Sequence, residues 1–323
     1  MGLPSLDEPA LRAIISPAGA VAAMREAFRA DGEGRTAVPA VINLPVPGTR
    51  GEFHVKTAWV DGVPLIAVKV ASGFYDNPAR GLPTGSGLMA LFDASTGMPL
   101  GLLFDNGFLT DIRTGAAGAV AADVLARRDV KTVGVIGSGV QARLQVACLR
   151  EVRRVERVIA WSIDGPGLDL YCREMRDAHG IEAIAAASAE DVCRGADILV
   201  TATPSREPIV RAQWLRPGMH VTAVGADAPG KQELEAACLT RADMVVVDRL
   251  AQCARFGELS HALAAGLLRE TDVSAQLGEI VAGRKPGRTS DNQITICDLT
   301  GVGFQDTAIA AMAWKNGTAS WKP

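Results

Sequence analysis

Short apolar runs alternate with amphipathic stretches through residues 130–250, and this is the most regular pattern in the chain. The runs are rich in β-branched residues and predict buried strands at 132–136, 157–161, 181–185, 197–201, 220–224 and 244–247. Strands that alternate with helices in this way are typical of a parallel sheet covered by helices on both faces. The pattern therefore predicts a doubly wound α/β domain.

The N-terminal third shows a different pattern of polar and apolar positions. Residues 16–30 predict a helix with Ser16 as its N-cap and Pro17 in its first turn. Closely spaced strands are predicted at 52–60, 65–71, 89–92 and 100–104. A loop is expected over 73–83, and a helix with a small-residue face over 110–128. Close strands separated by turns favour a mainly antiparallel or mixed sheet.

A glycine-rich turn follows the first strand of the α/β region. Its sequence, GSGVQA, has the form G-x-G-x-x-A and precedes an amphipathic helix pattern. In a dinucleotide fold, Gly137 allows the tight turn, Gly139 lets backbone approach a pyrophosphate, and Ala142 lets the helix pack closely on the sheet. The first N–H groups of the helix then face the phosphates, whereas the alternative is a turn that binds nothing. We predict a nucleotide site at Gly137, Ser138, Gly139, Val140, Gln141 and Ala142.

Turns after later strands supply further candidates, because ligands of such sheets bind at the carboxyl ends of the strands. Asp227 follows one of these strands and is placed for acid/base chemistry. The alternative is that Asp227 caps a helix that begins near Gln232. The other cofactor-binding candidates in these turns are Ala202, Thr203, Val224 and Gly225.

The end of the strand at 157–161 distinguishes the two nicotinamide cofactors. An acid there hydrogen-bonds the ribose 2′-OH of NAD, whereas an Arg favours the 2′-phosphate of NADP. The segment that follows contains Ser162 and Asp164 and has no Arg. The sequence therefore predicts NAD, with NADP as the alternative.

Three cationic residues stand in apolar or small-residue surroundings. Lys56 and Lys69 lie within predicted strands, and a buried ammonium needs a partner, such as a substrate carboxylate. The alternative places each lysine at a strand edge with its head in water. Arg113 and Thr114 stand near the start of the helix at 110–128, where an anion is favoured. The alternative for Arg113 is a surface ion pair.

Composition narrows the class of protein. The 323 residues are enough for about two domains, and the net charge of −3 gives no basic field for nucleic acid. Residues 150–157 are locally basic and are expected to form a solvated face. Six scattered cysteines and four histidines lack metal-ligand spacing, which predicts reduced core cysteines and no metal site. With no secretory signal and no apolar run of about 20 residues, we expect a cytoplasmic protein without a membrane segment.

Several long motifs resemble the ornithine cyclodeaminase/μ-crystallin family, in the same order along the chain. They are VKVASGFYDNP, GLPTGSGLMALFDASTGMPLG, LTDIRTGAAGAVAA, VGVIGSGVQAR, VGADAPGKQEL and CDLTGVGFQDTAIA. The resemblance covers nearly the whole length and implies a homodimer. It also implies that a Rossmann domain, residues 113–302, is inserted into a mixed-sheet α+β domain for substrate binding and dimerisation, residues 1–112 and 303–323.

The resemblance assigns roles to residues of this chain. Lys69 becomes a catalytic residue that contacts the substrate, and Asp227 becomes the acid/base. Arg113 binds the substrate carboxylate and, with Thr114, contributes to the cofactor site. The tail motif that approaches the nicotinamide contains Asp298, Thr300 and Gly301.

One departure from the family pattern concerns the substrate. Many members carry an Arg in a P-P-R motif that holds the α-carboxylate, whereas this chain has Val38–Pro39–Ala40. That difference argues against ornithine and simple alanine. The segments HVK, SGFYDNP and LFDNGFLTDIRTGAAG are most similar to a subgroup of ectoine utilisation proteins and iminosuccinate reductases. In that subgroup His54 and Lys56 are expected to replace the missing Arg.

Together these observations predict an NAD(P)H-dependent imine reductase that forms an amino acid, with iminosuccinate to aspartate as the leading reaction. One alternative is ornithine cyclodeaminase, which converts L-ornithine to L-proline and ammonia without net consumption of cofactor. Others are an alanine dehydrogenase or ketimine reductase, and a non-catalytic μ-crystallin-like protein that binds NADPH or another ligand. Retention of Lys69, Arg113 and Asp227 argues against the non-catalytic alternative.

Overall fold

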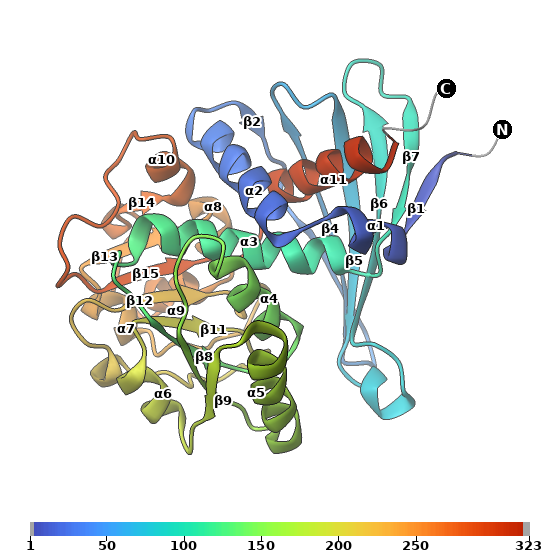
Figure 1. Cartoon of the computed structure of the whole chain (residues 1–323). Helices are drawn as coiled ribbons and strands as arrows, with labels where there is room; N and C mark the ends of the chain where they lie inside the picture. The colour runs from blue at the N-terminus through green and yellow to red at the C-terminus, as the bar shows by residue number, and fades with distance from the viewer. Residues whose placement is uncertain (1–2, 319–323) are drawn as a thin grey trace. The chain divides into compact units, whose positions relative to one another are not determined.

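The computed structural model describes residues 3–318, drawn in Figure 1. The chain divides into two compact units. The first comprises Met1–Arg113 together with Val302–Pro323, and the second is Thr114–Gly301, inserted between those two segments. Helix α3, Phe108–Leu125, crosses the sequence boundary between the units.

The first unit is built on a mixed, mainly antiparallel sheet with the order β1-β7-β6-β5-β4-β2, in which β3 also pairs with β4. Only β1 is parallel to its neighbour among the described strands of this sheet. Its strands are β1 Ser5–Asp7, β2 Thr36–Ala37, β3 Ile42–Val46, β4 Gly51–Val60, β5 Leu65–Phe74, β6 Gly85–Asp93 and β7 Pro99–Phe104. Its other elements are α1 Glu8–Ile14, α2 Pro17–Gly32, α11 Gly303–Thr318 and the 3₁₀ turn η1 Asn77–Arg80.

Helices α2 and α11 pack on one face of this sheet (Figure 1). Helix α2 begins where the sequence predicts, because the Ser16 hydroxyl accepts the Gly19 N–H and Pro17 occupies the first turn. The start of α11 lies against β4, so that a Cβ added at Gly303 would be 2.1 Å from the Thr57 carbonyl oxygen. The close approach requires glycine at this position. Strands β5 and β6 are longer than predicted, so the expected loop at 73–83 is shorter and contains η1.

The second unit is the predicted doubly wound domain. Its eight strands are all parallel, in the order β10-β9-β8-β11-β12-β15-β13-β14. They are β8 Thr132–Ile136, β9 Arg157–Trp161, β10 Glu182–Ala185, β11 Ile198–Thr201, β12 His220–Ala223, β13 Met244–Val247, β14 Ala275–Gln276 and β15 Thr295–Asp298. The helices are α4 Val140–Leu149, α5 Gly165–His179, α6 Ala189–Gly195, α7 Ala237–Arg241, α8 Leu250–Cys253, α9 Glu258–Ala264 and α10 Leu277–Val281, with 3₁₀ turns η2 Ala212–Trp214 and η3 Glu270–Asp272. The predicted combination of a parallel doubly wound sheet and a separate mixed sheet is confirmed.

Apolar clusters pack within the second unit, which also buries several polar and charged side chains. The six cysteines are buried here and form no disulfides. Burial raises the pKa of the Cys148 and Cys193 thiols to about 12, so these groups are neutral and behave as small apolar side chains. Within residues 3–318, no helix has both the length and the apolar composition to cross a membrane.

Candidate functional site

Lys56 and Lys69 lie directly opposite each other on β4 and β5. Both strands have neighbours on each side, and the two side chains are 7% and 2% exposed. The alternative that these lysines sit at strand edges with solvated heads is therefore wrong. Two buried ammonium groups side by side on one sheet face require nearby anions, because burying a charge without compensation is costly.

Asp306, in the first turns of α11, supplies one such anion. Its side chain is fully buried, and Lys69 Nζ lies 3.0 Å from Oδ1 and 2.9 Å from Oδ2. The Arg113 guanidinium also donates from Nε to Asp306 Oδ1, at 3.0 Å. One carboxylate from the C-terminal helix thus holds a lysine from β5 and an arginine from α3.

Arg113 is 4% exposed, so its predicted alternative of a surface ion pair is wrong. Besides its bond to Asp306, its Nη1 donates to Gln305 Oε1 at 3.2 Å. Gln305 is fully buried, and its Nε2 has no hydrogen-bond partner among the residues that the structure describes. A buried donor without an acceptor is unfavourable and is relieved by a ligand that brings an acceptor.

We call Lys56, Lys69, Arg113 and Asp306 the basic cluster. Its charges favour the binding of an added anion. Burial lowers the pKa of Lys69 to about 7; Asp306 opposes this shift, whereas Arg113 and Lys56 strengthen it. Burial alone would raise the pKa of Asp306, but Lys69, Arg113 and Lys56 together lower it. The carboxyl of Asp105 is a further acidic neighbour of Lys69. Lys69, Arg113 and Lys56 thus act together on one buried carboxyl group, that of Asp306.

His54 lies on β4 two residues before Lys56, on the same side of the strand. Its Nδ1 is 2.7 Å from the Asn43 side-chain oxygen across the β3–β4 pair, and its Nε2 is 3.5 Å from Glu52. Ala40 stands where the P-P-R motif described above would have its Arg. It is exposed in the irregular segment between β2 and β3. The cationic side chains near the sheet therefore come from strands and α3 rather than from this segment.

The glycine turn of the second unit fits a dinucleotide. Gly137 has φ of +116°, and a Cβ there would be 2.7 Å from the Ala202 carbonyl oxygen, so only glycine is accommodated. A Cβ at Gly139 would meet nothing within 4 Å, which leaves open space beside the backbone. Helix α4 begins at Val140 without a side-chain cap, and Ala142 is fully buried where the helix meets the sheet. Helix N–H groups, open space and a glycine turn together suit a pyrophosphate.

The neighbouring turn after β9 is tied to this loop by a 3.0 Å hydrogen bond between the Ser138 and Ser162 hydroxyls. Asp164 comes next and is the N-cap of α5, where its Oδ1 accepts the Gly167 N–H at 3.0 Å. This cap sets the start of α5 at Gly165. It also fixes a carboxylate close to the end of β9.

Asp227 lies in the turn after β12 with 46% of its side chain exposed. No helix begins near Gln232, because residues 225–235 form turns and a bridge, so the helix-cap alternative is wrong. Lys231 Nζ donates to Asp227 Oδ1 at 2.7 Å, and only 8% of the Lys231 side chain is exposed. The buried lysine therefore holds this partly exposed carboxyl in a defined orientation.

The remaining candidates line the same carboxyl edge of the sheet or the start of its helices. Asp248, just after β13, accepts the Thr300 and Gly301 N–H groups at 2.8 and 2.7 Å and so shapes the turn after β15. Asp298 itself is turned inward to the Leu259 N–H at 3.0 Å. The Thr114 carbonyl accepts Gln145 Nε2 at 3.0 Å, while Ala202 and Val224 continue the ladders of β11 and β12.

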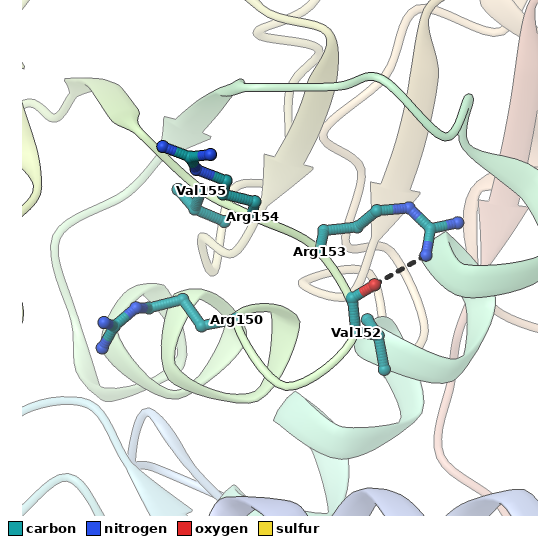
Figure 2. Close-up of a pocket in the computed structure, with 5 residues that line it drawn as sticks. All are labelled: Arg150, Val152, Arg153, Arg154 and Val155. Carbon is teal, nitrogen blue, oxygen red and sulfur yellow. Dashed lines mark hydrogen bonds between the residues drawn. The ribbon is translucent and has the colours of Figure 1, made fainter.

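A hollow is lined by the arginine-rich segment between α4 and β9, drawn in Figure 2. Most of this segment is solvated as predicted, but Arg153 is 7% exposed and is an exception. Its guanidinium donates to the Val152 carbonyl at 2.7 Å (Figure 2). It also donates to the backbone carbonyl and the carboxylate of Asp123. The hollow lies at the amino ends of β8 and β9, opposite the edge where doubly wound sheets bind cofactors. It is therefore separate from the nucleotide site.

Three residues of these sites are absent from the sequence-based candidates. Asp306 and Gln305 stand side by side in the tail motif, and a polar pair inside an otherwise apolar helix is the signal that indicates them. Lys231 stands four residues after Asp227. Within residues 3–318, no group of three or more His, Cys, Asp or Glu side chains is arranged to hold a metal ion.

A parallel sheet with this glycine turn, joined in sequence to a mixed sheet that buries a basic cluster, defines a dinucleotide-binding protein of the dehydrogenase type. Residues 13–320 match the profile of the ornithine cyclodeaminase/μ-crystallin family. The chain belongs to this family, as the motifs predict.

Named relatives have several activities. The chain is 44% identical over 312 residues to an uncharacterized cyclodeaminase of Sinorhizobium fredii, covering 96% of this chain and 94% of that one. It is similar to the structure of an archaeal alanine dehydrogenase dimer with bound NAD, with a TM-score of 0.92, 37% identity, and 99% and 97% of the two chains covered. It is also similar to the iminosuccinate reductase of Paracoccus denitrificans in complex with NAD⁺, with a TM-score of 0.90, 29% identity, and 98% and 97% covered.

Proposed function

We propose that this protein is an NADH-dependent reductase that converts an imine into an amino acid. The observation that carries the proposal is the basic cluster, in which the fully buried carboxylate of Asp306 contacts both Lys69 and Arg113, and the buried Lys56 lies opposite Lys69. Such a cluster favours a carboxylate ligand, and the glycine turn favours a dinucleotide. The related structures that hold NAD or NAD⁺ support the choice of cofactor.

In the proposed reaction, NADH supplies the hydride to the imine carbon. Gly137, Gly139 and the first N–H groups of α4 bind its pyrophosphate. Arg113 and Lys69 bind carboxylate oxygens of the substrate and hold the imine in one orientation. Asp227 exchanges a proton with the substrate nitrogen, directly or through water, while Lys231 holds its Oδ1 at 2.7 Å.

We further propose that the substrate has two carboxylates, with iminosuccinate, the precursor of aspartate, as the leading candidate. Lys56 and Lys69 are paired across β4 and β5, and Arg113 shares Asp306 with Lys69. A second substrate carboxylate adds a partner for this group of cations, which a monocarboxylic imine does not supply. The similarity to the iminosuccinate reductase named above supports this choice. On sequence resemblance, we also propose that the chain belongs to the ectoine-utilisation subgroup of the family.

The test compares NADH oxidation with oxaloacetate plus ammonia and with pyruvate plus ammonia. We expect at least a ~10²-fold higher kcat/KM for the dicarboxylic imine, because a buried charged hydrogen bond left unmade costs a few kcal/mol. Lys56→Met should remove much of this preference and leave the monocarboxylic activity. Lys131→Met is the matched control, since Lys131 is exposed and pairs with Glu156.

Other outcomes identify the alternatives. Equal rates with pyruvate and oxaloacetate contradict the dicarboxylate proposal and favour an alanine dehydrogenase or ketimine reductase. Conversion of L-ornithine to L-proline and ammonia without net NADH consumption identifies a cyclodeaminase. Binding of NADH or NADPH without turnover of any of these substrates identifies a μ-crystallin-like binding protein.

We also propose a homodimer, formed through the sheet face of the first unit that lies opposite Lys56 and Lys69. The strand registers place an apolar set on this face: Ile42, Leu44, Phe53, Val55, Trp59, Val68, Val70, Leu88, Phe92, Leu102 and Phe104. Ile42, Leu44 and Phe104 are 62%, 58% and 44% exposed, which is unusual for large apolar groups gathered on one face. A second copy of the same face covers it in an isologous contact.

Sedimentation analysis tests the dimer. Leu44→Asp should yield monomers, whereas Leu82→Asp, at an equally exposed leucine on the η1 loop, should not. A Leu44→Asp variant that remains dimeric contradicts this interface. We propose a cytoplasmic location for the reaction, because all six cysteines are buried and unpaired.

A further inference from the structure

Glu233 is a buried carboxylate that joins two turns at the carboxyl edge of the parallel sheet. Its side chain is fully buried. Oε1 accepts the N–H and the hydroxyl of Thr203, at 2.6 and 2.7 Å. Oε2 accepts the Gly225 N–H at 2.8 Å and the Thr201 hydroxyl at 2.7 Å. All four bonds run from a donor to the carboxylate, and they reach both β11 and the turns after β11 and β12.

The two turns approach each other closely at this point. A Cβ added at Gly225 would lie 2.2 Å from the Thr203 carbonyl oxygen and 2.5 Å from the Glu233 carboxylate. Asp227 follows Gly225 by two residues, so the position of Gly225 limits where the Asp227 side chain can lie. A small movement of either turn would therefore displace both the proposed cofactor-binding edge of the sheet and the Asp227 carboxyl.

Glu233 is itself held by a second buried carboxyl group. Glu258, at the start of α9, accepts the backbone N–H groups of Glu233 and Leu234 at 2.8 and 3.0 Å. The next residue of α9, Leu259, donates its N–H to Asp298 at the end of β15, at 3.0 Å. Three carboxyl groups in series thus connect the ends of β11, β12 and β15.

The chemistry of the site requires an acceptor without hydrogens to donate. A carboxylate offers two oxygens with about four lone-pair positions, which match four donors. A glutamine at the same place offers one oxygen, and its NH₂ group faces an N–H or a hydroxyl that already points inward. Burial raises the pKa of Glu233 to about 7, and the four donors oppose that shift.

We propose that Glu233 is a positioning residue that fixes the turns after β11 and β12 relative to each other and so shapes the NADH site and orients Asp227. This inference rests on the proposed NADH-dependent function. Glu233 acts through Thr203 and Gly225 rather than by touching the substrate, and it lies in none of the sequence-based candidate sites.

The experiment uses Glu233→Gln in the full-length protein, with Thr201→Val as the matched control. Thr201→Val removes one neutral donor to the same carboxylate from inside β11 and leaves the three other bonds in place. We expect Glu233→Gln to lower kcat/KM for NADH by about 10- to 100-fold, since small misplacements near the chemistry have effects of this size. Thr201→Val should change it by less than about threefold, even if both variants melt at lower temperature.

A purely structural role gives a different result. In that case both variants lose thermal stability and keep NADH kinetics near those of the wild type, which overturns the inference. Glu233→Asp retains the charge on a shorter arm and should fall between wild type and Glu233→Gln. If Glu233→Gln does not fold, Glu233→Asp decides, because NADH kinetics unchanged from the wild type in that variant overturn the inference. Wild-type protein that binds no NADH contradicts the proposed function instead.

Discussion

Binding of a dicarboxylate should weaken as the pH rises above about 7, because Lys69 loses its proton there. Burial lowers the pKa of this lysine to about 7; Asp306 opposes the shift, and Arg113 and Lys56 add to it. In the free protein Lys69 is therefore charged below about pH 7 and neutral above it. A bound carboxylate stabilises the charged form, so the complex takes up a proton when it forms at higher pH.

The contacts set the size of this effect. A hydrogen bond from a charged donor contributes about 1.5–3 kcal/mol, which corresponds to about 1–2 pKa units at about 1.4 kcal/mol per unit. The bound form of Lys69 then titrates near pH 8–9 by this estimate. The dissociation constant should rise about tenfold per pH unit above 7 and level off after a total change of about 10- to 100-fold.

Succinate is a suitable probe, because both of its carboxylates are ionised above about pH 7, where Lys69 loses its proton, and because it does not react. Its inhibition constant against the proposed imine reduction is measured between about pH 6 and about pH 9. Lys69→Arg provides the control, since a guanidinium stays charged and the pH dependence should flatten. A constant value in the wild type, or the same slope in Lys69→Arg, would refute the assignment of the proton to Lys69.

Replacing Asp227 with Asn should lower kcat by about 10²–10⁴-fold and leave NADH binding nearly unchanged, which steady-state kinetics and NADH fluorescence can separate; wild-type turnover would contradict the acid/base role. Replacing Asp306 with Asn leaves Lys69 and Arg113 without their shared carboxylate. We expect urea denaturation to show a loss of about 3–5 kcal/mol in the free energy of unfolding, and a loss below about 1 kcal/mol would be evidence against this pairing. NADH should be preferred over NADPH by about 5- to 150-fold in kcat/KM, because the Asp164 carboxylate at the start of α5 repels a 2′-phosphate, and equal use of NADPH would be contrary evidence.

The sequence predicts the local parts of this molecule well, because their signals lie within a few residues. The glycine turn at 137–142, the Ser16 cap and most strands of the parallel sheet depend on neighbours in the chain. The sequence shows the burial of Lys56 and Lys69 only in part. It places each lysine within an apolar strand, but it does not show that the two strands pair in this register or that helices cover them. The place of β15 between β12 and β13 has no local signal.

Pairings between distant segments could not be predicted in the same way. Asp306 contacts Lys69 across 237 positions of sequence, and no spacing rule connects them. Glu233 stands in a polar run, GKQELEAA, where an acidic residue is ordinarily solvated. Four hydrogen-bond donors from Thr201, Thr203 and Gly225 distinguish Glu233 from a solvated acid. They converge on its carboxylate only after β11 and β12 have paired. Buried charges therefore have to be found in three dimensions.

The position of β15 and α11 has a consequence for how the chain acquires its structure. Strand β15 completes the middle of one sheet, between β12 and β13, and α11 covers β4 and β5 of the other. Both elements lie within residues 295–318, at the end of the described chain. During synthesis, neither unit can close its core until this last segment has left the ribosome, and both cores depend on contacts between residues far apart in sequence. A truncation before Thr295 should thus unfold both units at once, rather than remove one and spare the other.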